Sequence, residues 1–106
     1  MGSYVCGRPV HPGEMLKEEI EYRGLSQTEV AERMKISYKI LNDILNCRRV
    51  VTAPVAILFE AVLGIDADMI MRMQLDCNMQ KARQDKLLNK RVKSIVPIYS
   101  SAAPHC

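Results

Sequence analysis

The chain has 106 residues, which is the size of one domain and excludes an active-site cleft between two large lobes. Hydrophobic residues make up 48% of it and charged residues 25%, the usage of a globular protein rather than a disordered one. Four Tyr, one Phe, no Trp and seven Met disfavour an all-β core and favour a compact helical one. The net charge of +3 is too small to identify a partner.

Start and stop signals predict three helices in the first half of the chain. Pro12 is preset for a first helical turn, and Gly24 ends that helix. The run Ser26-Gln27-Thr28-Glu29 is a capping box, in which the Ser hydroxyl and the Glu carboxylate satisfy free amides at a helix start. The short helix that it begins ends near Lys35. Ser37 caps the third helix, expected over about residues 37–46.

Two more helices are predicted in the second half, which gives an all-α fold of five helices. Thr52-Ala53-Pro54 begins the fourth and Gly64 ends it. Asp66 caps the fifth, which is expected to run to about residue 89. Residues 92–98 are strand-like but broken by Pro97, and residues 100–106 form a loose tail. The expected organisation is an N-terminal arm over 1–10, a helical domain over 11–91 and a short extended segment with the tail over 92–106.

The second and third helices are separated by about three residues, so they must cross steeply, as in a helix-turn-helix. That crossing needs a small residue where the helices meet, one inward apolar residue in the turn and a buried stripe on the second helix. The sequence supplies these at six positions: Val30, Ala31, Met34, Ile36, Leu41 and Ile44. The spacing therefore predicts a helix-turn-helix with its recognition helix at about 37–46.

The residues left outside this crossing suit the reading of a DNA groove. Asn42 can pair bidentately with adenine, and Lys39 can reach the O6 and N7 atoms of guanine. Tyr38 offers an apolar ring edge to a thymine methyl group, and Gln27 lies at the positive end of the second helix, where phosphate binds.

Further polar residues flank this face. Ser37 opens the recognition helix, and Asn46, Arg48 and Arg49 follow it as candidates for contacts with the DNA backbone. A carboxylate at Asp43 repels phosphate unless it accepts from cytosine N4 or pairs with a neighbouring Lys or Arg. The predicted DNA-binding residues are Gln27, Ser37, Tyr38, Lys39, Asn42, Asp43, Asn46, Arg48 and Arg49.

Positive charge is concentrated in two short stretches. Residues 35–49 hold four basic residues and one acidic residue, and residues 81–93 hold six and one. Residues 50–80, between them, hold one basic and four acidic residues. Each basic stretch is a candidate to contact a polyanion or an acidic partner, with a solvated helix face as the alternative for residues 81–93.

The sequence resembles the HigA-type antitoxins of the XRE, or lambda-repressor-like, helix-turn-helix class over residues 11 to about 98. The resemblance implies a homodimer that binds a palindromic operator in double-stranded DNA, represses its own operon and neutralises a RelE-like (HigB-like) RNA-cleaving toxin. The motifs that carry it are His11-Pro12-Gly13-Glu14, residues 24–31, Ile36-Ser37, residues 41–46, Arg48-Arg49, Thr52, residues 61–64 and Met73-Gln74.

The chain departs from this family at three places. Lys35 and Cys47 stand where Gly is common, and a left-handed backbone there costs a non-Gly residue about 1 kcal/mol or more. Asn46 is the alternative site for the left-handed residue at the end of the recognition helix. Met69-Ile70 replaces a Phe-Trp pair, so a Met-rich cluster is expected to pack in the core.

Catalysis, metal binding, cofactors and membrane insertion are not expected. There is no H-E-x-x-H motif, no Gly-rich phosphate loop and no Ser-His-Asp set. The cysteines at 6, 47, 77 and 106 form no C-x-x-C pair, which argues against zinc. No signal peptide or run of about 20 apolar residues is present, so the thiols are expected to be reduced in the cytoplasm, with a disulfide framework as the alternative.

Three functions remain open. The first is the operon-repressing antitoxin, and the second is a helix-turn-helix repressor of phage or plasmid type without a toxin partner. The third is a toxin-binding module whose DNA binding has decayed. A repressor's affinity for its site should fall steeply with salt, whereas a decayed module should show a flat response.

Overall fold

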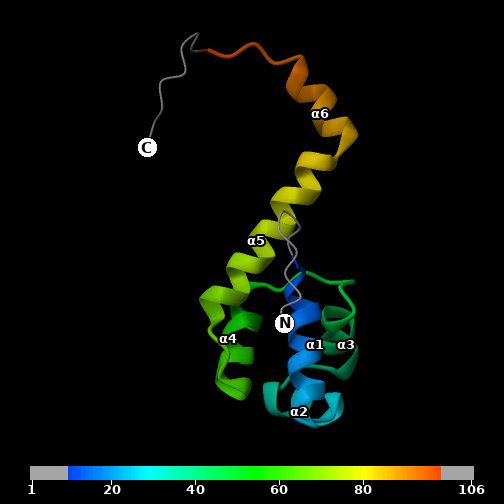
Figure 1. Cartoon of the computed structure of the whole chain (residues 1–106), viewed down its shortest axis with the longest axis vertical. Coiled ribbons are helices and arrows are strands. Elements are labelled where there is room, and N and C mark those ends of the chain that lie inside the picture. The colour runs from blue at the N-terminus through cyan, green and yellow to red at the C-terminus, as the bar shows by residue number, and fades with distance from the viewer. Residues whose placement is uncertain (1–9, 99–106) are drawn as a thin grey trace.

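The computed structural model describes residues 10–98, which form an all-helical fold about 54 Å long and 25–27 Å wide. Four short helices and the first part of α5 form a compact body, from which the rest of α5 and α6 project (Figure 1). No helix within residues 10–98 is long and apolar enough to cross a membrane. The helices are α1 (Pro12–Tyr22), α2 (Gln27–Met34), α3 (Tyr38–Leu45), α4 (Ala53–Leu63), α5 (Ala67–Gln84) and α6 (Lys86–Lys93).

The predicted capping residues begin the helices. The Ser26 hydroxyl accepts a 3.0 Å hydrogen bond from the Glu29 amide, and the Ser37 hydroxyl accepts one of 3.1 Å from the Ile40 amide. Half of the predicted capping box is therefore present. Within the described chain, the Glu29 carboxylate pairs with Arg33 at 3.2 Å instead of turning back to the helix start. The starts of α2 and α3 are thus set by local sequence.

The prediction of five helices is wrong, since residues 10–98 contain six. The backbone of Asp85 is extended, and its carboxylate accepts from the amides of Leu87 and Leu88 at 2.9 and 3.2 Å. These bonds end α5 and begin α6, because an Asp side chain satisfies amides that a continuous helix would have used internally.

The extended C-terminal segment also differs from the prediction. Val92 and Lys93 are the last residues of α6, and residues 94–98 form neither helix nor strand. Residues 1–9 of the predicted arm, which was expected over 1–10, and the part of the predicted tail beyond residue 98 lie outside the described residues.

The core has the composition that the helix-turn-helix pattern predicted. Five of its six positions are buried, and the sixth, Ile36, is partly buried and packs against the core. Phe59, the single Phe of the chain, is fully buried. Met34 and Met73 are buried, as expected for core packing, while Met69 and Met71 are only partly buried.

Two residues with a side chain have left-handed backbones, at the positions where the resemblance led us to expect that conformation. Lys35 has φ +62° and Cys47 has φ +63°, and no other non-Gly residue within 10–98 has a positive φ. Asn46 has φ −100°, so the alternative of a left-handed Asn46 is wrong. Each left-handed residue ends a helix abruptly, which keeps the turn after α2 and the loop after α3 short.

The first turn of α1 packs against the end of α3. The His11 ring accepts at Nδ1 a 2.8 Å hydrogen bond from the amide of Gly13. A β-carbon on Gly13 would overlap the carbonyl oxygen of Ile44, which belongs to the backbone of α3. The glycine of the His-Pro-Gly-Glu motif therefore allows α1 to approach α3 more closely than any other residue would.

We expect Gly13→Ala to lower the free energy of unfolding by about 2–3 kcal/mol, because the new methyl group meets backbone rather than a movable side chain. Thr28→Ala, at an exposed position of α2, is the control and should change the free energy of unfolding by no more than about 0.5 kcal/mol. Urea denaturation compares the two. Equal transition midpoints would show that α1 and α3 are not in close contact.

Candidate nucleic-acid interface

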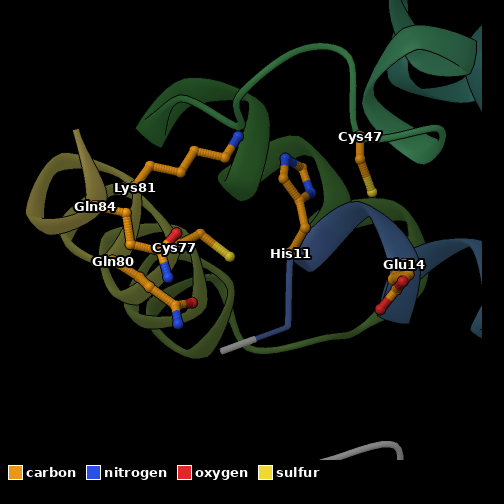
Figure 2. Close-up of a pocket in the computed structure, with 7 residues that line it drawn as sticks. All are labelled: His11, Glu14, Cys47, Cys77, Gln80, Lys81 and Gln84. Carbon is orange, nitrogen blue, oxygen red and sulfur yellow. The ribbon is translucent and has the colours of Figure 1, made fainter. Parts of the chain in front are cut away.

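A hollow of about 480 Å³ lies between the start of α1, the loop after α3 and α5. Its lining residues come from all three segments (Figure 2), namely His11, Glu14, Cys47, Cys77, Gln80, Lys81 and Gln84. Burial, helped by the charge of Lys81, lowers the pKa of His11, which keeps Nδ1 free to accept from Gly13. Burial raises the pKa of both thiols, so neither is an activated thiolate.

This hollow does not form a metal site. Within residues 10–98, no group of three or more His, Cys, Asp or Glu side chains is arranged to hold a metal ion. The polar residues that the sequence singled out lie instead on and around α3, outside this hollow.

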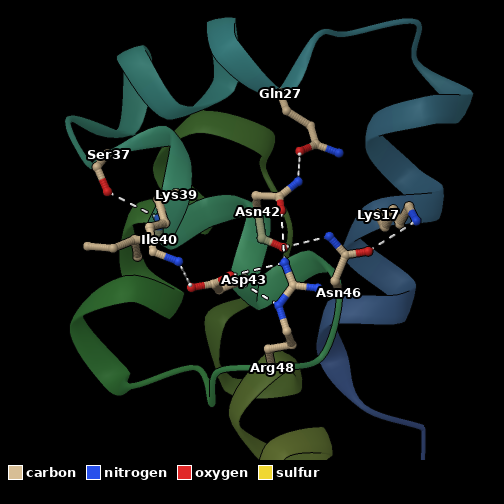
Figure 3. A network of polar contacts seen from close by, with 9 residues as sticks. All are labelled: Lys17, Gln27, Ser37, Lys39, Ile40, Asn42, Asp43, Asn46 and Arg48. Atoms are coloured by element: carbon tan, nitrogen blue, oxygen red, sulfur yellow. Dashed lines mark hydrogen bonds and ion pairs between the residues drawn. The ribbon is translucent and has the colours of Figure 1, made fainter.

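The outer face of α3 lies beside the start of α2, which brings Gln27 to Asn42 (Figure 3). The Asn42 amide donates from Nδ2 to Oε1 of Gln27 at 3.0 Å. Its Oδ1 accepts a 3.1 Å bond from the guanidinium of Arg48. Both ends of the Asn42 amide are therefore oriented before any ligand arrives, and each retains one further hydrogen-bonding position for an adenine edge.

Asp43 pairs with neighbouring cations, the second of the two alternatives that the sequence left open for this carboxylate. Lys39 lies 3.2 Å from one carboxylate oxygen and Arg48 lies 3.1 Å from the other. The hydrogen bond from Lys39, together with that from Arg48, lowers the pKa of Asp43 below its usual value. The carboxylate is therefore ionised at neutral pH, and the positive charges of Lys39 and Arg48 balance its negative charge. This balance reduces its repulsion of a polyanion.

The two arginines after α3 have different environments. Arg48 is bonded to both Asn42 and Asp43, which makes it part of the α3 network rather than an isolated surface charge. Arg49 is exposed and has no salt bridge within residues 10–98. Their positions in the sequence predict the same role for both, whereas their different contacts predict different effects when each is replaced.

The remaining predicted residues lie at the two ends of α3. Tyr38 is 51% exposed on the first turn, and the Ser37 hydroxyl is used to cap the helix. Asn46, at the other end, donates to the Asn42 carbonyl at 2.9 Å and accepts from Lys17 of α1 at 3.4 Å. All nine predicted residues thus come from three successive segments, namely the start of α2, α3 with its cap, and the loop that follows.

Sequence reasoning missed two residues that support this surface. Lys17 of α1 donates to the side chain of Asn46, and nothing in the local sequence indicates that contact. Gln74 is buried on α5, where its Oε1 accepts from the Val51 amide at 2.8 Å and its Nε2 donates to Asn78 at 2.9 Å. A polar residue in register with Ile70 and Cys77 on a buried helix stripe was the signal that could have identified it.

The model of the helix-turn-helix family HTH_3 matches residues 16–70, the span from α1 into α5 that contains this surface. The chain belongs to the XRE-type helix-turn-helix family. It is 32% identical to virulence-associated protein I of Dichelobacter nodosus over 94 residues, 88% of this chain and 84% of that protein. It is also 32% identical to antitoxin HigA-1 of Vibrio cholerae over 95 residues, 89% of this chain and 88% of that protein.

The fold of this chain is also similar to that of an antitoxin HigA whose structure was solved with DNA. The Pseudomonas aeruginosa antitoxin HigA, determined with the higBA promoter, matches with a TM-score of 0.74 and 28% identity over 87% of this chain and 100% of that one. Within the helix-turn-helix family, the chain is therefore of the HigA antitoxin type. This family assignment covers the compact body and most of α5 and α6.

Proposed function

We infer that this HigA-type chain acts in the cytoplasm as a homodimer, binds a palindromic operator with α3 in the major groove, represses its own operon and neutralises a RelE-like toxin. The observation that carries the DNA-binding part is the oriented Asn42 amide, held between Gln27 and Arg48 on an exposed helix. An amide fixed in this way loses less conformational entropy when it pairs with a base. The promoter bound by the Pseudomonas relative supports the same role for this face.

The roles of the individual residues follow from their surroundings. Asn42 reads adenine, and Lys39 reaches guanine after exchanging its ion pair with Asp43 for the base. The second amide group of Gln27, at the positive end of α2, donates to a phosphate while its oxygen holds Asn42. Tyr38, Ser37, Asn46 and Arg49 contact the DNA backbone or a thymine methyl group at the margins.

The ion pairs of Asp43 agree with a repressor, whose recognition helix must approach phosphate. Lys39 and Arg48 pair with both carboxylate oxygens, so Asp43 adds no uncompensated negative charge to the outer face of α3. Two-fold symmetry would place the two copies of α3 in successive major grooves, about 34 Å apart.

Asn42→Ala is expected to weaken operator binding by about 1–3 kcal/mol and to abolish the preference at one base pair in each half-site. The affinity for a set of singly substituted duplexes, measured by fluorescence anisotropy at one salt concentration, gives both the loss of binding and the loss of base preference. Asn89→Ala, which removes the same amide from α6, is the matched control and should leave the base preference intact. An unchanged preference in Asn42→Ala would refute the base-reading role.

The two arginines should respond differently to substitution by Ala. Arg49→Ala is expected to weaken binding to all duplexes alike and to lower the slope of log affinity against log salt by about 0.9, the loss of one phosphate contact. Arg48→Ala should in addition blur the base preference at the Asn42 position, since it releases the Asn42 oxygen. Arg72→Ala, an equal charge change on α5, is the control. A base-specific loss in Arg49→Ala would contradict its backbone role.

Toxin neutralisation is tested with the adjacent open reading frame. We expect this chain to restore growth when that frame is co-expressed and to co-purify with its product. Asn42→Ala should keep both properties while losing operator specificity, because it changes only the α3 surface. Failure of the folded wild-type chain to restore growth would favour a repressor without a toxin partner.

A further inference from the structure

The loop after α3 (residues 46–52) is bonded to α3 at its start but depends on an outside contact at its end. The amides of Cys47 and Arg48 donate to backbone carbonyls of α3 at 3.0 and 2.8 Å. Val51, near the other end, precedes α4 and is not helical, so its amide has no helical partner. Val51 is also buried, and a buried amide without a partner is costly. A side chain from elsewhere in the fold must therefore meet it.

Gln74 of α5 supplies that side chain. It is 3% exposed, and its Oε1 accepts from the Val51 amide at 2.8 Å. The other buried residues of this part of α5, Ile70, Met73 and Cys77, pack without hydrogen-bonding partners of this kind. An apolar side chain at position 74 would complete the same stripe, whereas a buried amide is stable only when its partners are in place. The amide of Gln74 therefore serves the loop rather than the packing of the core.

Asn78 fixes the orientation of the Gln74 amide. The oxygen and nitrogen ends of this group have nearly the same shape, and only the oxygen can accept from the Val51 amide. Asn78 lies four residues later on α5, and its Oδ1 accepts from Nε2 of Gln74 at 2.9 Å. If the Gln74 amide turned over, both of these hydrogen bonds would be lost. The contact with Asn78 thus keeps the Gln74 oxygen directed at the loop.

The position of the loop matters for the recognition helix because Arg48 extends from it. The Arg48 side chain is 60% exposed, and its guanidinium donates to Oδ1 of Asn42 at 3.1 Å. Exposed polar contacts are weak when the groups that make them are free to move, since ordering them costs conformational entropy. A loop that is held at Val51, three residues after Arg48, reduces that cost.

We propose that Asn78 and Gln74 form a relay that positions the loop after α3, so that Arg48 orients the Asn42 amide for reading a base. Both are positioning residues that act without contact to DNA. The inference rests on the base-reading role of Asn42 in the proposed function and assigns part of that role to α5.

Amide hydrogen exchange of the DNA-free protein, followed residue by residue by NMR, tests the hold on the loop. Gln74→Met has a similar length and no hydrogen bond, so exchange at the Val51 amide should become about tenfold faster. Gln80→Met makes the same chemical change at a half-buried position of α5 and is the control, with unchanged exchange at Val51. Unchanged exchange at Val51 in Gln74→Met would overturn the relay. Equal acceleration at the amides of α1 and α2 would also overturn it, since it would indicate a general loss of stability.

Base preference tests the effect on recognition. In Gln74→Met, discrimination at the base pair read by Asn42 should fall about threefold or more, measured by fluorescence anisotropy with singly substituted duplexes. Asn78→Ala should cause a smaller loss, because the Gln74 amide can then turn over. Gln74→Glu and Asn78→Asp each keep an accepting oxygen and should retain the preference. A purely structural role would instead weaken binding to all duplexes alike, and that result would overturn the proposal.

A double-mutant cycle tests the route through Arg48. Once Arg48→Ala has released the Asn42 oxygen, adding Gln74→Met should cause little further loss of base preference. Losses that add fully in the double variant would show that Gln74 does not act through Arg48, which would overturn the relay.

The exchange measurement uses no DNA, so it separates this inference from the proposed function. A wild-type chain without base preference, in which Gln74→Met still frees the Val51 amide, would refute base reading and support the hold of the relay on the loop. A wild-type chain whose base preference survives Gln74→Met would overturn the relay and leave the proposed function intact.

Discussion

The left-handed turn at Lys35 is the constraint on which the recognition surface depends. Because this residue ends α2 abruptly, Ser37 can cap α3 only two residues later, and the two helices must cross. The crossing brings the first residue of α2, Gln27, to the middle of α3, where it meets Asn42. A longer turn would separate these side chains, and the Asn42 amide would then keep only its bond from Arg48.

The loop after α3 is fixed from three sides. Cys47 takes the left-handed conformation that turns the chain, and the Val51 amide at the far end of the loop is held by Gln74 of α5. Arg48 lies between these two points and bonds to α3. The backbone of Arg48 therefore lies in a loop that is held at both ends, which places its side chain within reach of Asn42 and Asp43.

Local signals predicted most of the fold, and long-range contacts account for what they did not predict. Helix starts at Pro12, Ser26 and Ser37 depend on side chains within three residues, so the sequence displays them directly. The break at Asp85 was missed because no Pro or Gly marks it. A capping Asp within a helical run differs from a surface Asp only in the bonds that it makes.

The candidate site shows the same division between what is local and what is not. Residues that face outward on α3 follow from helical periodicity, which is why Tyr38, Lys39 and Asn42 could be predicted from spacing alone. The roles of Arg48 and Gln74 depend on partners 6 and 23 residues away, and no sequence spacing encodes those contacts. A single sequence therefore identifies the residues that can reach a ligand more readily than those that hold them in position.

Helix α5 supports the recognition surface from behind. Gln74 is buried between α5 and the loop after α3, where its side-chain oxygen accepts from the Val51 amide and its amide group donates to Asn78 one turn further along the helix. One face of α5 therefore holds the end of the loop that carries Arg48. A change that moved Gln74 would release this loop, so α5 matters for operator recognition even though none of its residues needs to touch DNA.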